Sequence, residues 1–219
     1  MSNNMPLAES FSNSIKEESF SCLSEIAEAA LDSITNDGFV TNVPLISTVV
    51  SLYKIGNSIR ERAYLKKLAV FIDAFNRGVV DEEERQLHLQ KFCEDKRSRE
   101  RELEYIVLLL DRQLECTQAY LLAKFYLHYL NGKITWDNFC VYAGIIDKIL
   151  IADIDCIKEI YKKELITSAD INESGEDSIM RISSLGIIRA NLGLAYTPNV
   201  RFEYLVTERG KEFGKIAFE

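Results

Sequence analysis

The chain has 219 residues, of which 47% are hydrophobic and 27% charged, and its formal net charge is -8. This composition excludes a disordered chain and disfavours a protein whose whole surface binds nucleic acid phosphates, because that requires a positive surface. The five cysteines lie too far apart in the sequence to form a CxxC zinc or redox motif. The N-terminus lacks the basic and apolar regions of a secretory signal, so we expect a cytoplasmic protein with reduced cysteines.

The N-terminal region predicts a disordered start and then a helix. Residues 1–11 are polar and predict a disordered N-terminus. Apolar residues at three- and four-residue spacing predict a helix over residues 12–34, which the turn Asn36-Asp37-Gly38 ends.

A stretch without charged residues follows, at residues 38–53. Pro44 within it predicts the start of a helix that continues past Lys54, with a break near Gly56. A further helix is predicted over residues 60–77, where apolar residues again recur with helical spacing. Gly78 is its expected C-cap.

The middle of the chain predicts long helices. The strongest helical pattern runs as one helix from about Arg99 to Leu130, and Asn131-Gly132 ends it. Thr135 is the expected N-cap of the next helix, and another helix is expected over residues 153–165. We therefore predict a mainly α protein with a helical bundle domain over residues 12–166.

The C-terminal part of the chain differs from the bundle. A polar linker at 167–178 precedes a short helix, then alternating residues near 201–205 predict a strand and Thr207 predicts the N-cap of a last helix. This pattern resembles the second half of a winged-helix domain, and the resemblance implies a small α+β domain at 167–219. The residues that carry the resemblance are Leu185, Gly186, Ile187, Ile188, Tyr204, Leu205, Thr207, Gly210 and Phe213.

Catalytic motifs are missing from the sequence. Only two histidines occur, His88 and His128, and no GxSxG, GxxxxGK[ST] or GxGxxG pattern is present. His128 falls on the apolar stripe of a predicted helix, where a hydrogen-bonded core histidine is expected. Asp147, Asp153 and Asp155 have no ExxH partner for a metal pair, so a solvated face is expected there. We predict a protein that is not an enzyme and that needs no cofactor or metal.

The uncharged stretch is the main candidate functional segment. Sixteen residues are fewer than the ~20 that span a bilayer as one helix, so a buried helix of the bundle is the simplest interpretation. The flanking residues favour a membrane-binding segment instead. Residues 54–77 carry six basic against two acidic residues, while residues 1–37 carry one basic against seven acidic residues. An apolar segment beside a basic one is what an anionic membrane surface attracts. The candidate membrane-active residues are Val43, Leu45, Ile46, Val49, Val50, Leu52 and Tyr53, and the basic flank consists of Lys54, Arg60, Arg62, Lys66 and Lys67.

The first 160 residues also resemble small helical proteins of bacterial and phage mobile elements, some of which are anti-phage effectors thought to act on membranes. The resemblance lies in the uncharged stretch around Pro44, in the run KIGNSIRER at 54–62, and in the stretches LLLDRQLE and NGKITWDNF. It implies an effector that acts on membranes. The uncharged stretch and its flanks add our own hypothesis: the bundle stores the segment 39–55 and releases it when a partner, such as a phage protein, triggers assembly on the membrane.

Two other functions remain open on the sequence. A winged-helix DNA-binding regulator would contact DNA through Arg181, Arg189 and Arg201, but residues 178–219 carry only six basic against four acidic residues, which makes nucleic acid the weaker partner. An immunity or adaptor protein would instead neutralise a basic partner with its acidic surface. The leading expectation is a cytoplasmic, non-enzymatic effector that recognises another protein, self-assembles and associates with the membrane when it is activated.

Overall fold

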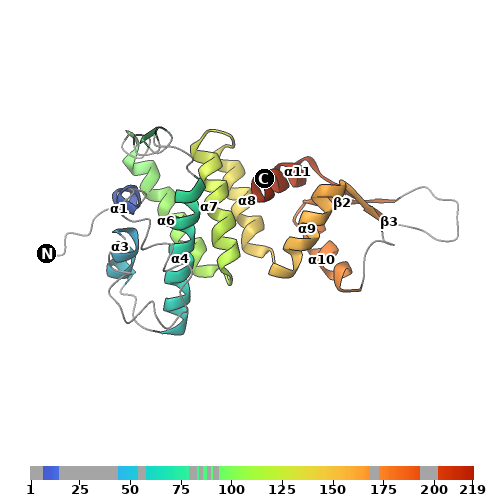
Figure 1. Cartoon of the computed structure of the whole chain (residues 1–219), viewed down its shortest axis with the longest axis horizontal. Helices are drawn as coiled ribbons and strands as arrows, with labels where there is room; N and C mark the ends of the chain where they lie inside the picture. The colour runs from blue at the N-terminus through green and yellow to red at the C-terminus, as the bar shows by residue number, and fades with distance from the viewer. Residues whose placement is uncertain are drawn as a thin grey trace. The chain divides into compact units, whose positions relative to one another are not determined.

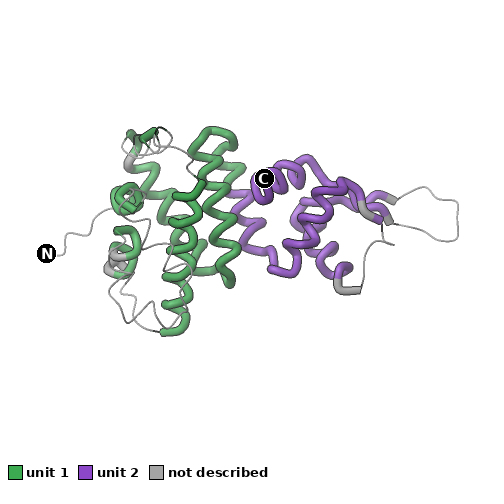
Figure 2. Tube along the Cα trace, viewed as in Figure 1, with its two compact units in different colours: residues 1–139 green, residues 140–219 purple. Residues whose placement is uncertain are grey.

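The computed structural model describes residues 7–14, 44–53, 58–78, 83, 86–87, 90, 94–167, 173–192 and 202–219. These residues are mostly helical, with a small antiparallel sheet near the C-terminus, as the sequence predicts. The chain divides into two compact units, residues 1–139 and residues 140–219 (Figure 2). Each unit is described by itself below.

Unit 1 is all-helical over its described residues (Figure 1). Helix α4 packs on α7 and forms the centre of the unit, while α1 packs on α3 and α6. The described helices are α1 (Leu7–Ser14), α3 (Pro44–Tyr53), α4 (Ile59–Gly78), α6 (Lys96–Arg112), α7 (Cys116–Leu130) and the start of α8 (Trp136–Lys148). Aromatic rings fill much of the centre, since Phe71, Phe75 and Tyr126 are all fully buried.

The prediction of a disordered N-terminus over residues 1–11 is wrong for residues 7–11. These residues form most of α1, in which Leu7, Ala8 and Phe11 are buried. The polar composition of the segment concealed this pattern, because Leu7 and Phe11 are four residues apart and so lie on the same face of a helix. The described part of the predicted helix over 12–34 is limited to residues 12–14, which belong to α1.

The predicted single helix from Arg99 to Leu130 is two helices. The chain breaks at Gln113, whose backbone is extended (φ -62°, ψ 145°), and α7 begins at Cys116. No proline or glycine marks the break, which is why the helical spacing appeared continuous. The Gln118 side chain stabilises it, because its Oε1 accepts hydrogen bonds from the backbone N–H groups of Leu114 and Glu115, at 3.0 and 3.1 Å.

Several predicted boundaries are confirmed. Pro44 is the first residue of α3, where its missing N–H costs no helical hydrogen bond. Gly78 is the last described residue of α4, so its expected role as the C-cap stays a prediction. A Cβ atom there would lie 2.6 Å from Leu127 Cδ2, so glycine allows α4 and α7 to approach closely. Thr135 Oγ1 accepts from the backbone N–H of Asn138 at 3.2 Å and thus caps α8.

Unit 2 combines helices with a three-stranded antiparallel sheet. It contains the rest of α8, α9 (Ile151–Lys163), β1 (Leu165–Thr167), α10 (Glu173–Ser184), β2 (Ile188–Leu192), β3 (Phe202–Val206) and α11 (Glu208–Phe218). The sheet order is β1-β3-β2, with Leu205 opposite both Leu165 and Arg189. Thr207 caps α11 as predicted, since its Oγ1 accepts from Gly210 N at 3.0 Å.

The fold is therefore mainly α with a small α+β part at the C-terminus. The sequence prediction begins the C-terminal domain at residue 167, whereas α9 packs on α10, on α11 and on β1, and the division into compact units lies within α8. In unit 2 the described residues contain one helix, α10, between β1 and β2.

Candidate functional site

The described part of the predicted membrane-active segment is helix α3. Leu45, Ile46 and Val49 are buried, with exposures of 1%, 0% and 0%, and Val50 is half-buried. Leu52 and Tyr53 also belong to α3, whereas Val43 lies outside the described residues. In this structure the described apolar side chains of the segment are packed inside unit 1.

Helix α3 is held mainly by α1 among the described elements. The Ser14 Oγ atom accepts a hydrogen bond from the backbone N–H of Leu45 at 2.9 Å, and so binds a free amide in the first turn of α3. The hydroxyls of Ser10 and Thr48 are 2.7 Å apart and share a buried hydrogen bond. Neutral hydroxyl groups therefore make these polar contacts between α1 and α3.

Helix α1 is in turn held at both ends by side chains from the rest of unit 1. The Glu100 carboxylate accepts from the backbone N–H groups of Leu7 and Ala8, at 2.7 and 2.8 Å. A carboxylate at this position also interacts favourably with the N-terminal end of the helix dipole. At the other end, Asn76 Nδ2 donates to the Ser14 carbonyl at 3.3 Å.

The centre of α1 is anchored by Phe11, which is fully buried. Its ring centroid lies 5.0 Å from that of Phe75, in an edge-to-face arrangement, and 6.0 Å and 6.3 Å from those of Phe71 and Tyr126. Such aromatic contacts contribute about 0.5–1.5 kcal/mol each beyond the burial of apolar area. The sequence analysis did not select Phe11 or Glu100. The four-residue spacing of Leu7 and Phe11 is the signal that could have indicated Phe11.

Beneath this aromatic cluster lies a buried polar network around Glu102, which is 5% exposed. Its carboxylate accepts from Tyr126 Oη at 3.2 Å, from Tyr129 Oη at 2.9 Å and from Arg99 Nη1 at 2.5 Å. Burial raises the pKa of the Tyr126 phenol above its usual value, and the neighbouring Glu102 raises it further. The network satisfies a buried charge and orders the rings, which is a structural role.

Two residues of the predicted basic flank bind the C-terminal end of α6. Arg60 forms an ion pair with Asp111 at 2.9 Å, and Lys67 Nζ donates to the backbone carbonyls of Asp111 and Gln113. Positive charge at this end of a helix is favourable. Burial lowers the pKa of the Lys67 ammonium, although Asp111 opposes the effect. Arg62 and Lys66 are half-buried, and Lys54 lies outside the described residues.

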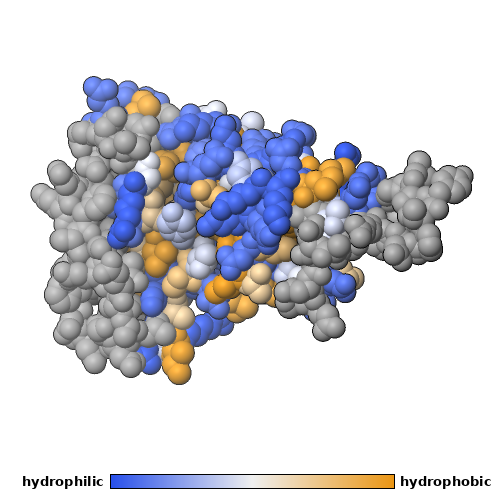
Figure 3. Space-filling model, turned by 45° about the vertical axis from the view of Figure 1, so that its right-hand side comes forward, coloured by the Kyte–Doolittle hydropathy of each residue, from blue (hydrophilic) through white to orange (hydrophobic). Residues whose placement is uncertain are grey.

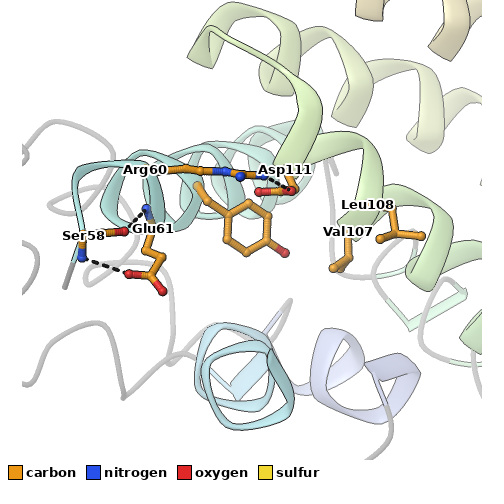
Figure 4. A pocket seen from close by; sticks show the side chains of 7 residues that line it. Ser58, Arg60, Glu61, Val107, Leu108 and Asp111 are labelled. Carbon is orange, nitrogen blue, oxygen red and sulfur yellow. Dashed lines mark hydrogen bonds and ion pairs between the residues drawn. The ribbon is translucent and has the colours of Figure 1, made fainter. Parts of the chain in front are cut away.

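A pocket of about 310 Å³ opens between α4 and α6 (Figure 4). Its described lining is Ser58, Arg60, Glu61, Tyr64, Val107, Leu108 and Asp111. Ser58 and Glu61 form a capping box, since Ser58 N donates to Glu61 Oε2 and Glu61 N donates to Ser58 Oγ, at 2.9 and 3.3 Å. No histidine, cysteine or lysine is among these described lining residues, so they offer an apolar wall with a charged rim and no nucleophile and base pair.

Two of the three candidate contact residues of the C-terminal part, Arg181 and Arg189, are described. Arg181 binds the fully buried Asp153, with Nη2 and Nε of Arg181 at 2.7 and 3.1 Å from Asp153 Oδ1. Arg189 is exposed on β2, and Arg201 lies outside the described residues. The guanidinium that the sequence offered as the main phosphate contact is thus engaged within unit 2.

Groups that could support other chemistry are few in the part of the chain that the structure describes. No cluster of three or more His, Cys, Asp or Glu residues is placed there to bind a metal ion. His128 Nδ1 lies 3.1 Å from the Lys124 carbonyl, within its own helix, and His88 is outside the described ranges. Cys116 and Cys156 are free thiols, and burial raises the pKa of both.

The surface of the described residues is mixed. Hydrophilic residues cover much of the face drawn in Figure 3, with apolar residues exposed between them. None of the described helices combines the length and the apolar character that a membrane span needs.

Comparison with known proteins returns no match to a family model, to a curated protein or to a solved structure. The class of protein that the fold defines is a mainly α protein of two compact units with a small antiparallel sheet.

Proposed function

We propose that the protein is a non-enzymatic effector that releases helix α3 onto an anionic membrane surface when another protein triggers it. In the resting protein α3 is buried; after release, several copies assemble and permeabilise the membrane. The resemblance to mobile-element proteins adds a biological setting, which is defence of a bacterial cell against phage by abortive infection. The resting protein is cytoplasmic.

One observation carries this proposal: among the described residues, an uncharged helix contacts the unit chiefly through another short helix. The sequence of α3, PLISTVVSLY, has no charged residue, and its described contacts are made mainly with α1. Loss of the α1 contacts would therefore free an apolar segment that directly precedes the basic residues of α4. A ten-residue helix is ~15 Å long, about half the hydrocarbon thickness of a bilayer, so the proposed binding is interfacial.

The test is dye release from vesicles of phosphatidylglycerol and phosphatidylcholine. Phe11→Ala removes the anchor of α1, and we expect this variant to release dye faster than the wild-type chain does, with a rate that rises with the phosphatidylglycerol fraction. Adding Val49→Asp to this variant places a charge on the apolar face of α3 and is expected to abolish release. Insertion of a charged side chain into the apolar region costs about 2.5–3.5 kcal/mol.

A matched control carries the same substitution far from α3 in the sequence. Val141 on α8 is 43% exposed, so Val141→Asp in the Phe11→Ala background is expected to leave dye release unchanged. Circular dichroism melts establish that each variant is folded. If the folded Phe11→Ala variant releases no dye at any phosphatidylglycerol fraction, or if Val141→Asp and Val49→Asp act alike, the membrane function is wrong.

A further inference from the structure

We infer that the surface beneath α1 is the recognition site for the trigger, and that the trigger is a helical segment with the chemistry of α1. This surface is called the α1 groove, and it consists of Phe71, Phe75, Asn76, Glu100 and Tyr126. The inference rests on the proposed function, because it names the partner that would start the release of α3.

The α1 groove specifies its occupant in three ways. Glu100 accepts two backbone N–H groups from the first turn of a helix, which only a helix that begins there can offer. The rings of Phe71, Phe75 and Tyr126 surround one aromatic side chain four residues later. Asn76 donates to a carbonyl at the end of that helix. A fitting helix therefore begins with an apolar residue whose backbone N–H donates to Glu100, carries phenylalanine four residues later, and ends after about two turns.

Helix α1 meets these requirements but is short. It has eight residues, while isolated helices of fewer than ~12–15 residues are marginal in water. Its helical structure thus depends on the groove. Helix α1 stays in the groove because it belongs to the same chain, which gives it an effective concentration on the order of millimolar near the groove. A helix of the same length that its own protein holds preformed makes the same contacts without the ordering cost and competes with α1.

Displacement of α1 also removes the described contacts between α1 and α3. Ser14 would no longer accept from Leu45 N, and the hydroxyl bond between Ser10 and Thr48 would be lost. Leu45 and Thr48 lie in α3, so α1 couples the groove to the stored helix. When the trigger helix replaces α1 in the groove, α3 loses its contacts with α1, so binding of the trigger and release of α3 occur in the same step.

The probe for the groove is a fluorescein-labelled peptide with the sequence of residues 6–15, PLAESFSNSI, titrated into the full-length chain. Leu7 is 2% exposed, so Leu7→Ala weakens the intramolecular competitor without touching the groove. We expect the Leu7→Ala chain to bind the peptide at least tenfold more tightly than the wild-type chain. A peptide in which alanine replaces the phenylalanine is expected to bind the same chain at least tenfold more weakly.

A second measurement uses the wild-type chain alone. Saturating peptide is expected to accelerate hydrogen exchange at the Leu45 amide at least tenfold, and the alanine peptide is expected to have no such effect. Equal binding to the wild-type and Leu7→Ala chains, or equal effects of the two peptides, would overturn the inference. If the peptide binds and accelerates exchange but no variant causes vesicle leakage, the recognition site is retained and the membrane function is rejected. If Phe11→Ala causes leakage but the peptide does not bind, the membrane function is retained and the recognition site is rejected.

Discussion

The α1–α3 pair and unit 2 are held together by different kinds of contact. In the pair, hydroxyl groups join the two helices, with Ser10 bound to Thr48 and Ser14 bound to Leu45 N. In unit 2, a fully buried carboxylate, Asp153, binds the guanidinium of Arg181. Charged hydrogen bonds are about twice as strong as neutral ones. We therefore expect the direct contact between α1 and α3 to open at a lower free-energy cost than the Asp153–Arg181 contact of unit 2.

Close backbone packing adds to this difference. A Cβ atom on Gly210 would lie 2.1 Å from the Ile187 carbonyl oxygen, and one on Gly214 would lie 2.3 Å from the Tyr161 ring. Helix α11 can approach the rest of unit 2 so closely only because glycine stands at both positions. Local opening is expected where such contacts are few, because subregions of a protein unfold with different free energies.

The largest effect is expected from Gly210→Ala. The added Cβ atom must displace backbone at Ile187, and we expect the free energy of opening of unit 2 to fall by about 3 kcal/mol. Hydrogen exchange at the amides of β2 and β3 measures this change. Gly144→Ala is the control: Gly144 lies in α8 with no atom near its added Cβ, so alanine is expected to be neutral or to stabilise by up to about 1 kcal/mol.

A smaller effect is expected from Asp153→Asn. The substitution retains the size of the side chain but removes its charge, and we expect unit 2 to lose about 2 kcal/mol, since hydrogen bonds to charged groups contribute about 1.5–3 kcal/mol. Arg181 is 37% exposed and so can be partly solvated, which limits the loss. Hydrogen exchange at the amides of α10, measured at increasing urea concentrations, gives this loss of stability.

The same pair predicts a pH dependence. Burial alone would raise the pKa of Asp153, but hydrogen bonds from Arg181, Leu150 N and Ser178 outweigh it and lower the pKa. The stabilisation is therefore complete above the ordinary aspartate pKa of about 3.9 and is lost as the pH falls through the lower folded value. The difference between wild type and Asp153→Asn should shrink below about pH 4. A constant difference down to about pH 2 would contradict this account.

The smallest effect is expected from Ser10→Ala, and it concerns the other region. Loss of one buried hydroxyl bond should lower the opening free energy of the α1–α3 pair by about 1 kcal/mol, as measured by exchange at the α3 amides, and should leave unit 2 unchanged. Ser184→Ala on the exposed end of α10 should change the stability of unit 2 by less than about 0.5 kcal/mol. If the α3 amides exchange as slowly as those of α10 in every variant, the two regions do not differ as proposed.

The helices that the sequence predicted well carry their own boundary signals. Pro44, Thr135 and Thr207 each act at a helix start through their own backbone or hydroxyl, and local chemistry of this kind can be read from neighbouring residues. The break at Gln113 could not be read in this way. It depends in part on Lys67, which lies 46 residues earlier and binds the carbonyls at the end of α6.

The candidate site likewise combines features that the local sequence shows with contacts between residues far apart in the chain. The uncharged character of α3 and the basic residues after it are visible in the sequence. Their partners are not, because Ser14 lies 31 residues from Leu45 and Asp111 lies 51 residues from Arg60. Basic residues were assigned to membrane or nucleic acid contacts, whereas Arg60, Lys67 and Arg181 bind groups of their own unit. Only the folded chain reveals which charges are already neutralised.

The single tryptophan of the chain has a practical consequence. Trp136 stacks on Phe139, with ring centroids 5.0 Å apart, and its ring also approaches Tyr129 and Tyr105. All four rings belong to unit 1. Indole emission is therefore a built-in optical reporter for that unit, and a shift in its wavelength during a titration can be assigned to unit 1 without attaching a dye.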